Sequence, residues 1–303
     1  MSRQIIVAEN AGFCFGVKRA VDMTVDYNNK NDSKVYTLGP LIHNEDVVRS
    51  LEEQGIYQID SDAIEKLNPG DTIVIRSHGI TPEIKEQIKK AGAKMVDATC
   101  PYVSSIQRKA RKYHKQGYQI IIVGDRNHPE VIGINGWCNN SAIVTKDGSE
   151  LRDLPDKVCV LSQTTEKQSN YEKTLEAVSG QGREVLAFNT ICNATRERQS
   201  SADQVSKIVD MMVVIGGRHS SNTKKLYEIC SRNCSNTILV ENSSELPEWA
   251  VKDPEIKKVG ITAGASTPDW IIDDVIKKLR GIEQQDMNGN KTAAGAKATE
   301  DNR

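Results

Sequence analysis

Three cysteines recur at nearly even intervals in this chain. Cys14, Cys100 and Cys192 are separated by 86 and 92 residues, and each is followed by a polar run typical of a helix. A histidine comes 27 to 29 residues after each cysteine, as His43, His128 and His219. Because self-similarity at a regular interval indicates repeated structural units, this spacing predicts three related modules that could bring three thiolates to one centre.

Three converging thiolates could bind one metal centre. Zinc sites usually contain closely paired ligands such as C-x2-C, and ferredoxins use dense cysteine runs. The three phased cysteines show neither pattern. Three thiolates near a pseudo-threefold axis instead match a [4Fe–4S] cluster in which one iron has no protein ligand, and such an open position is what a metal needs for chemistry on a substrate. The alternative is three buried structural thiols.

Hydroxyl, amide and imidazole side chains stand where an anion could bind. One segment follows a glycine pair and contains Ser220, Ser221 and Asn222, and another follows a glycine and contains Ser266. Both precede an expected helix, whose N-terminus favours anions. Other strand ends add His43, His78 and His128. The set suits a phosphate or diphosphate, although the GxxxxGK[ST] and GxGxxG patterns are absent, and each histidine taken singly is more commonly an ordinary surface or core residue.

A single acidic residue stands beside these candidates. Glu130 lies two residues after His128, with Pro129 between them. A carboxyl group beside an imidazole and a bound anion could relay protons. The alternative is a first-turn carboxylate that interacts with a helix dipole. Thr164, in the segment SQTT, could hydrogen-bond Glu130 and hold its rotamer.

The rest of the chain alternates amphipathic helical stretches with short apolar runs. The runs are QIIVA, KVYTL, TIVIRS, QIIIVG, VCVLSQ, EVLAF, MMVVIGG and KVGITAG. Continuous Val- and Ile-rich runs are typical of strands buried on both faces, and their alternation with helices predicts an α/β fold with parallel sheets. Ligands of such sheets bind beyond the carboxyl ends of the strands, where RSHG, DRNHPE, SQTT, RHSSNT and ASTPDW stand. Any one of these clusters alone could be an ordinary helix cap.

The repeat predicts three small α/β modules related by a pseudo-threefold axis. The expected boundaries are 15–99, 100–189 and 190–283 plus 1–14. Modules of about 90 residues fall at the small end of the usual domain range. Residues 284–303 are small and polar and lack an apolar period, which predicts a disordered tail.

Composition limits the partners and the compartment. The 40 basic and 41 acidic residues nearly cancel, so no global field attracts nucleic acid and an anion site must be local. No run approaches the ~20 apolar residues of a membrane span, and the N-terminus lacks a signal-peptide core. We therefore expect a cytoplasmic protein with neither nucleic acid nor membrane as partner. Disulfides are rare there, and the cysteines outside the repeat are expected to be structural: Cys138, Cys159, Cys230 and Cys234.

Nine segments in this order resemble the LytB/IspH family of 4-hydroxy-3-methylbut-2-enyl diphosphate reductases: GFCFGVKRA, GPLIHNEDVV, RSHG, DATCP, NHPEVIG, SQTT, NTICNATRERQ, GGRHSSNT and GITAGASTPDW. The resemblance covers residues 4–282. It implies a cloverleaf of three α/β modules around a central iron–sulfur cluster. It also implies the last step of the non-mevalonate (MEP) isoprenoid pathway, in which two electrons and two protons convert an allylic alcohol that carries a diphosphate into isopentenyl and dimethylallyl diphosphate and water.

The same resemblance implies roles for individual residues. Cys14, Cys100 and Cys192 would be the three ligands of one [4Fe–4S] cluster with one open iron. Glu130 falls on the proton-donor position, with Thr164 and His128 also in the catalytic group. The substrate-binding positions correspond to His43, His78, His128, Thr164, Ser220, Ser221, Asn222 and Ser266. Because no flavin or nicotinamide motif is present, electrons are expected from an external donor, a ferredoxin or flavodoxin.

Two other functions remain open from the residues alone. One is a zinc-dependent hydrolase with Cys or His ligands and Glu130 as base. The other is a non-enzymatic iron–sulfur sensor. Iron content would separate the first from a reductase, and substrate-dependent oxidation of a reduced dye would separate the second.

Overall fold

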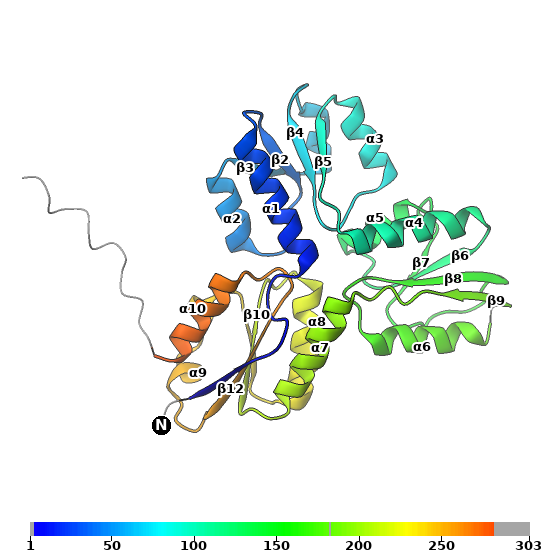
Figure 1. The fold of residues 1–303 in the computed structure, drawn as a ribbon. Helices are drawn as coiled ribbons and strands as arrows, with labels where there is room; N and C mark the ends of the chain where they lie inside the picture. Colours follow the sequence, from blue (N-terminus) through cyan, green and yellow to red (C-terminus); the bar gives the residue numbers. More distant parts are fainter. Residues whose placement is uncertain (1–2, 182, 282–303) are drawn as a thin grey trace, which may run out of the picture.

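Three separate parallel sheets form the framework of the protein. The computed structural model describes residues 3–181 and 183–281, and within them twelve strands form three sheets of four strands each. The tail predicted for 284–303 lies outside the described residues. Figure 1 shows the sheets as the centres of three lobes that meet in the middle of the molecule. The predicted α/β fold with three parallel sheets is therefore confirmed.

The three sheets share one strand order. The first contains β3 (Ile56–Ile59), β2 (Val35–Leu38), β4 (Thr72–Ile75) and β5 (Lys94–Asp97). The second contains β7 (Ile143–Thr145), β6 (Gln119–Val123), β8 (Lys157–Ser162) and β9 (Glu184–Ala187). The third contains β11 (Thr237–Val240), β10 (Met211–Ile215), β12 (Lys258–Ala263) and β1 (Gln4–Val7). The strand from the beginning of the chain thus completes the last sheet, while the module boundaries given above stay a prediction.

Helices cover both faces of every sheet, as Figure 1 shows. The first lobe has α1 (Phe15–Lys30), α2 (Glu45–Glu53), the 3-10 turn η1 (Ser61–Lys66) and α3 (Pro82–Lys90). The second has α4 (Pro101–Lys115), α5 (Pro129–Gly136) and α6 (Gln168–Ser179). The third has α7 (Asn193–Ser206), α8 (Ser221–Asn233), η2 (Ser243–Glu245), α9 (Glu248–Lys252) and α10 (Asp269–Leu279). No helix in the described part of the chain is long and apolar enough to cross a membrane.

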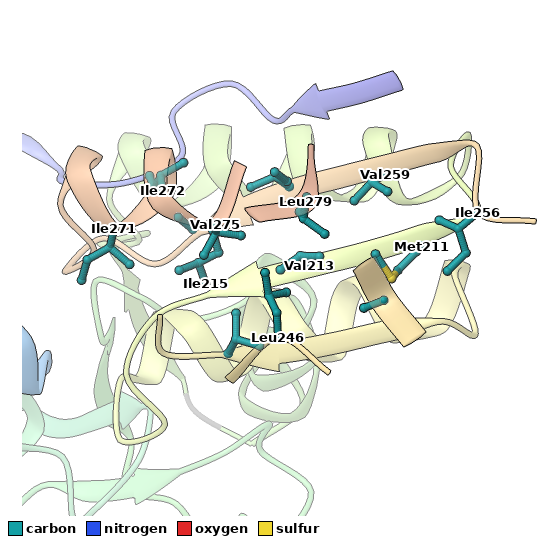
Figure 2. Close-up of a cluster of buried hydrophobic side chains, with 14 residues drawn as sticks. Met211, Val213, Ile215, Leu246, Ile256, Val259, Ile271, Ile272, Val275 and Leu279 are labelled. Atoms are coloured by element: carbon teal, nitrogen blue, oxygen red, sulfur yellow. The ribbon is translucent and has the colours of Figure 1, made fainter. Parts of the chain in front are cut away.

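Alternate residues of each central strand pack on opposite faces, because side chains on a strand alternate. In β10, Met211, Val213 and Ile215 join the apolar cluster of α9 and α10, which Figure 2 shows. Met212 and Val214 instead pack against α7 and α8. This two-sided burial explains why the central strands are continuous apolar runs.

Four strands are not predicted by the apolar runs of the sequence, and all four lie at sheet edges: β3, β5, β7 and β11. Edge strands are half covered, and β3 and β5 contain exposed residues that break up the apolar run. Every central strand is predicted. The central strands therefore follow from apolar runs, whereas only two of the six edge strands, β1 and β9, do.

Candidate active site

Each phased cysteine stands at the start of a helix that follows an outer strand. Cys14 follows β1 and is the N-cap residue of α1; Cys100 does the same between β5 and α4, and Cys192 between β9 and α7. All three are free thiols, and all three line one pocket. The structure thus brings together the three cysteines that the repeat singles out.

Gly16 leaves room for the sulfur atoms. A Cβ at Gly16 would lie 2.6 Å from Cys100 Sγ and 4.0 Å from Cys14 Sγ, so both sulfurs border the same space. Burial raises the pKa of Cys100 to about 11 and also raises the pKa of Cys192. Since metal ligation deprotonates thiols, three unpaired thiols that face one pocket fit a metal cluster held by three cysteines.

Three histidines form a second group in the same pocket. The ring centroids of His43 and His78 are 4.9 Å apart, those of His78 and His128 5.3 Å, and those of His43 and His128 5.7 Å. Each follows the carboxyl end of a central strand, namely β2, β4 or β6. Gly217 lets its own backbone lie against that of His43, because a Cβ at Gly217 would collide with the carbonyl oxygen of His43.

The three imidazoles are neutral near pH 7. Burial is the main cause that lowers the pKa of His43 to about 4 and of His128 to about 3, and it holds the pKa of His78 well below its usual value. His43 Nε2 and His78 Nδ1 are buried without a hydrogen-bond partner. These nitrogens are available to a ligand, because each neutral ring can donate to a phosphate oxygen or bind a metal ion.

The hydroxyl and amide side chains lie beside the histidines. Ser220 is the N-cap residue of α8, and Ser221 and Asn222 form its first turn. Asn222 is 2% exposed, and neither its Oδ1 nor its Nδ2 has a partner. Ser266 follows β12, and its Oγ donates to the carbonyl oxygen of His43 at 3.1 Å. The pocket is lined by all four of these side chains, and the helix N-terminus adds backbone donors for an anion.

Glu130 and Thr164 close the same pocket from the second lobe. His128 is the N-cap residue of α5, and its Nδ1 accepts from the backbone N–H of Glu130 at 3.2 Å. The predicted hydrogen bond between Thr164 and Glu130 is present, with Thr164 Oγ1 2.6 Å from Glu130 Oε2. Burial raises the pKa of Glu130, while the hydrogen bonds from Thr164 lower it. Glu130 thus combines the first-turn position of the alternative interpretation with a place in the pocket.

One phased histidine lies outside the pocket, and two cations that the sequence does not single out lie at it or beside it. His219, in step with His43 and His128, is exposed and does not line this pocket. Arg198 does line it, as a buried residue of α7. Lys225, on α8, does not line the pocket but donates to Ser221 Oγ at 3.2 Å and to Glu166 Oε2 at 3.0 Å. In the sequence, nothing distinguishes Arg198 or Lys225 from the other basic residues near them.

The remaining candidates lie elsewhere. The four other cysteines are buried in apolar clusters, as predicted for structural residues: Cys138, Cys159, Cys230 and Cys234. His114 hydrogen-bonds the side chains of Asn139 and Ser141 on the surface of the second lobe. None of these five lines the central pocket.

Comparison with known proteins gives a consistent result. The family described as "LytB protein" matches residues 5–280. A Clostridium tetani protein named 4-hydroxy-3-methylbut-2-enyl diphosphate reductase is 56% identical over 276 residues, which is 91% of this chain and 43% of that protein. A Clostridium perfringens (strain SM101) protein of the same name is 53% identical over 282 residues, which is 93% of this chain and 100% of that protein. The chain thus spans less than half of the first relative and the full length of the second.

Two solved structures are similar in fold. One is described as (E)-4-hydroxy-3-methyl-but-2-enyl diphosphate reductase, the terminal enzyme of the non-mevalonate pathway; it has 42% identity and a TM-score of 0.66, and the match covers 92% of this chain and all of that one. The other is the E-1-hydroxy-2-methyl-but-2-enyl-4-diphosphate reductase of Plasmodium falciparum, with 25% identity, a TM-score of 0.84 and coverage of 91% and 88%.

Proposed function

Because the chain belongs to the LytB protein family, we propose that it reduces 4-hydroxy-3-methylbut-2-enyl diphosphate, the last reaction of the non-mevalonate pathway. The observation that carries this function is one pocket lined by three free thiols, three neutral histidines and a buried carboxyl group. The reaction replaces a hydroxyl group by hydrogen: two electrons and two protons enter, and isopentenyl or dimethylallyl diphosphate and water leave.

The three cysteines are the residues that would hold the redox group. The LytB family is one of iron–sulfur enzymes, and we assign Cys14, Cys100 and Cys192 as the ligands of one [4Fe–4S] cluster. When bound there, such a cluster supplies single electrons and an open iron that acts as a Lewis acid. The free thiols and the space beside Gly16 support this assignment. A separate ferredoxin or flavodoxin would deliver the electrons.

The neutral histidines and the N-terminus of α8 would bind the diphosphate. His43 and His78 have free nitrogens, and Asn222 has a free amide, all of them buried. Ser220, Ser221 and Ser266 add hydroxyl groups. Neutral donors in a fixed arrangement hold an anion without rearranging when it binds. Positioning of this kind can lower the activation free energy of a reaction by about 7–11 kcal/mol in favourable cases.

Glu130 would deliver a proton to the departing hydroxyl group. Burial raises its pKa, which favours the protonated form that a general acid needs. Hydroxide is a poor leaving group, and protonation lets the oxygen leave as water. Thr164 is close enough to hold the carboxyl group in place and to supply Glu130 with a new proton through its own hydroxyl group.

The three histidines also offer a competing metal site. One ligand atom from each of His43, His78 and His128 lies within 4.8 Å of the other two, and neutral imidazoles suit zinc. This geometry is the observation in favour of a zinc-dependent hydrolase with Glu130 as base. We favour the diphosphate at this position because Asn222 and the N-terminus of α8 share the pocket and suit an anion.

Anaerobic purification followed by metal analysis and assay tests the proposal. We expect about four irons and four sulfides per chain, little zinc, and oxidation of reduced methyl viologen that depends on the allylic diphosphate. Zinc without iron would favour the hydrolase. Iron without substrate-dependent dye oxidation, at a substrate concentration shown to be bound by calorimetry, would favour a sensor.

A further inference from the structure

Arg198 is a buried cation whose partners are neutral. Its side chain is 2% exposed. Nη2 donates to the carbonyl oxygen of Gly12 at 2.9 Å and Nη1 to that of Ala194 at 3.1 Å, while Nε is buried without a partner. Among the described residues, no carboxylate forms an ion pair with it. Because an unpaired buried charge is costly, a site of this kind indicates a missing anion.

The missing negative charge lies on the sulfur side of the pocket. Arg198 lines the pocket with Cys14 and Cys192. Metal ligation deprotonates cysteine, so a cluster held by these thiolates would place negative charge in the pocket that Arg198 lines.

Arg198 also joins two segments that carry these cysteines. Gly12 stands two residues before Cys14, and Ala194 stands two residues after Cys192. The hydrogen bond to Gly12 therefore spans 186 residues of sequence and links α7 to the loop that leads into α1. One rigid guanidinium group thereby fixes the distance between two of the three sulfur-bearing loops.

We propose that Arg198 is a positioning residue of the sulfur centre, which holds the Cys14 loop against the Cys192 loop and favours the reduced state of a bound cluster through its positive charge. The inference rests on the proposed iron–sulfur function. A reduced cluster carries one more negative charge than the oxidised cluster. A fixed cation in a buried site stabilises the added charge, and local charge and hydrogen bonds to sulfur set the potentials of iron–sulfur clusters.

Midpoint potentials of the iron-loaded protein test the charge. Wild type, Arg198→Met and Arg198→Lys would be purified anaerobically, analysed for iron and titrated with dithionite while the cluster is followed by electron paramagnetic resonance. In Arg198→Met we expect the equilibrium constant for reduction of the cluster to fall at least tenfold, which lowers the midpoint potential by ~59 mV for one electron. In Arg198→Lys, which keeps the charge, we expect that constant to stay within threefold of wild type. The Arg198→Lys protein should still melt at a lower temperature, because the hydrogen bonds to Gly12 and Ala194 are lost.

Arg19→Met is the matched control. Arg19, on α1, donates to the carbonyl oxygen of Thr99 at 3.3 Å, directly before Cys100, but it is half-exposed and does not line the pocket. We expect the equilibrium constant for reduction of its cluster to stay within threefold of that of wild type. If Arg198→Met fails to retain iron, Arg198→Gln replaces it in the same comparison, because it removes the charge but keeps an N–H donor.

Three outcomes would overturn the inference. The first is an Arg198→Met or Arg198→Gln potential equal to that of wild type, and the second is an Arg198→Lys potential as low as that of the uncharged variants. The third is a midpoint potential that decreases as much in Arg19→Met as in Arg198→Met. Wild-type protein without iron would contradict the proposed function and, with it, this role of Arg198; iron-loaded wild type with an unaltered Arg198→Met potential would contradict this role alone.

Discussion

Thr164 binds both carboxyl oxygens of Glu130. Its backbone N–H donates to Oε1 at 2.7 Å, and its hydroxyl group lies 2.6 Å from Oε2. Thr164 follows β8, and Glu130 lies in the first turn of α5, which follows β6. Segments after two strands of one sheet therefore fix a single carboxyl group. The orientation of Glu130 toward the pocket therefore depends on the backbone after β8 as well as on its own helix.

Glu130→Gln should retain the cluster and bind substrate but lose most turnover. The amide keeps the size of the side chain and cannot supply the proton, and general acid catalysis typically contributes 10²- to 10⁴-fold. Iron content, substrate binding by calorimetry and kcat check this. Normal turnover would remove Glu130 from the proton path.

Cys192→Ser should lose cluster iron, because a serine hydroxyl is a much poorer iron ligand than a thiolate. Cys138→Ser is the matched control, since Cys138 is fully buried but outside the pocket. We expect iron to drop only in Cys192→Ser, and unchanged iron and sulfide in that variant would contradict the ligand assignment.

Gly16→Ala should also impair cluster binding without removing a ligand. The added methyl group would lie 2.6 Å from Cys100 Sγ and displace it. Gly180→Ala controls for the general effect of the substitution, because a Cβ at Gly180 would have no neighbour within 4 Å. Iron analysis after reconstitution compares the two, and equal iron contents would show that the space beside Gly16 is dispensable.

Lys225→Met should raise KM for the diphosphate more than it lowers kcat. Lys225 holds Ser221 and is itself paired with the buried Glu166, so the change removes a positive charge near the anion. It should also cost on the order of 3 kcal/mol of folding free energy, because Glu166 is left unpaired. Steady-state kinetics and urea unfolding measure the two effects.

Two further variants separate charge from stability at this position. Adding Glu166→Gln to Lys225→Met should recover much of the folding free energy and leave KM high. Lys224→Met changes the exposed neighbouring lysine and should alter KM less. A KM in Lys225→Met that matches that of Lys224→Met would contradict a role of Lys225 in diphosphate binding.

Stability should fall as the pH decreases from about 7 to 5. Burial lowers the pKa of His43 to about 4 and of His128 to about 3, against 6.5 for an unperturbed imidazole. Below pH 6.5 the unfolded chain therefore binds protons that the folded protein does not, which favours unfolding. His128→Asn, which can still cap α5, should reduce the loss between pH 7 and 5 by about 2 kcal/mol. Urea unfolding at both values measures this, and an unchanged difference would contradict the low pKa.

The sequence predicts the framework best where burial is two-sided. The apolar runs of β6 and β10 are unmistakable because both faces of each strand are covered. β5 has the burial pattern of a half-covered strand, with exposed Lys94 and Asp97 at its ends, and its sequence resembles that of a loop. Edge strands are specified by their neighbours, which a local pattern does not contain.

The site is predictable at strand ends and much less so on helices. Ser220 and His128 could be assigned because they follow buried strands and cap helices. Arg198 could not, because it shares one stretch of α7 with Arg196, and only the packing of α7 against the Cys14 loop makes Arg198 buried and Arg196 exposed. The exposed His219 shows the converse: regular spacing in sequence does not fix which way a loop side chain points.

The pairing of β1 has a consequence for biosynthesis. In its sheet, β1 is hydrogen-bonded only to β12, which a ribosome makes some 250 residues later. During translation the first two lobes can form as their own strands emerge, as domains generally do, and α1 can pack in the first lobe at that stage. β1 and the backbone N–H of Cys14, which donates to the carbonyl oxygen of Ala265, reach their partners only after β12 has left the exit tunnel. The loop that carries Cys14 can therefore take its final position for iron binding only after the chain has been made through Ala265.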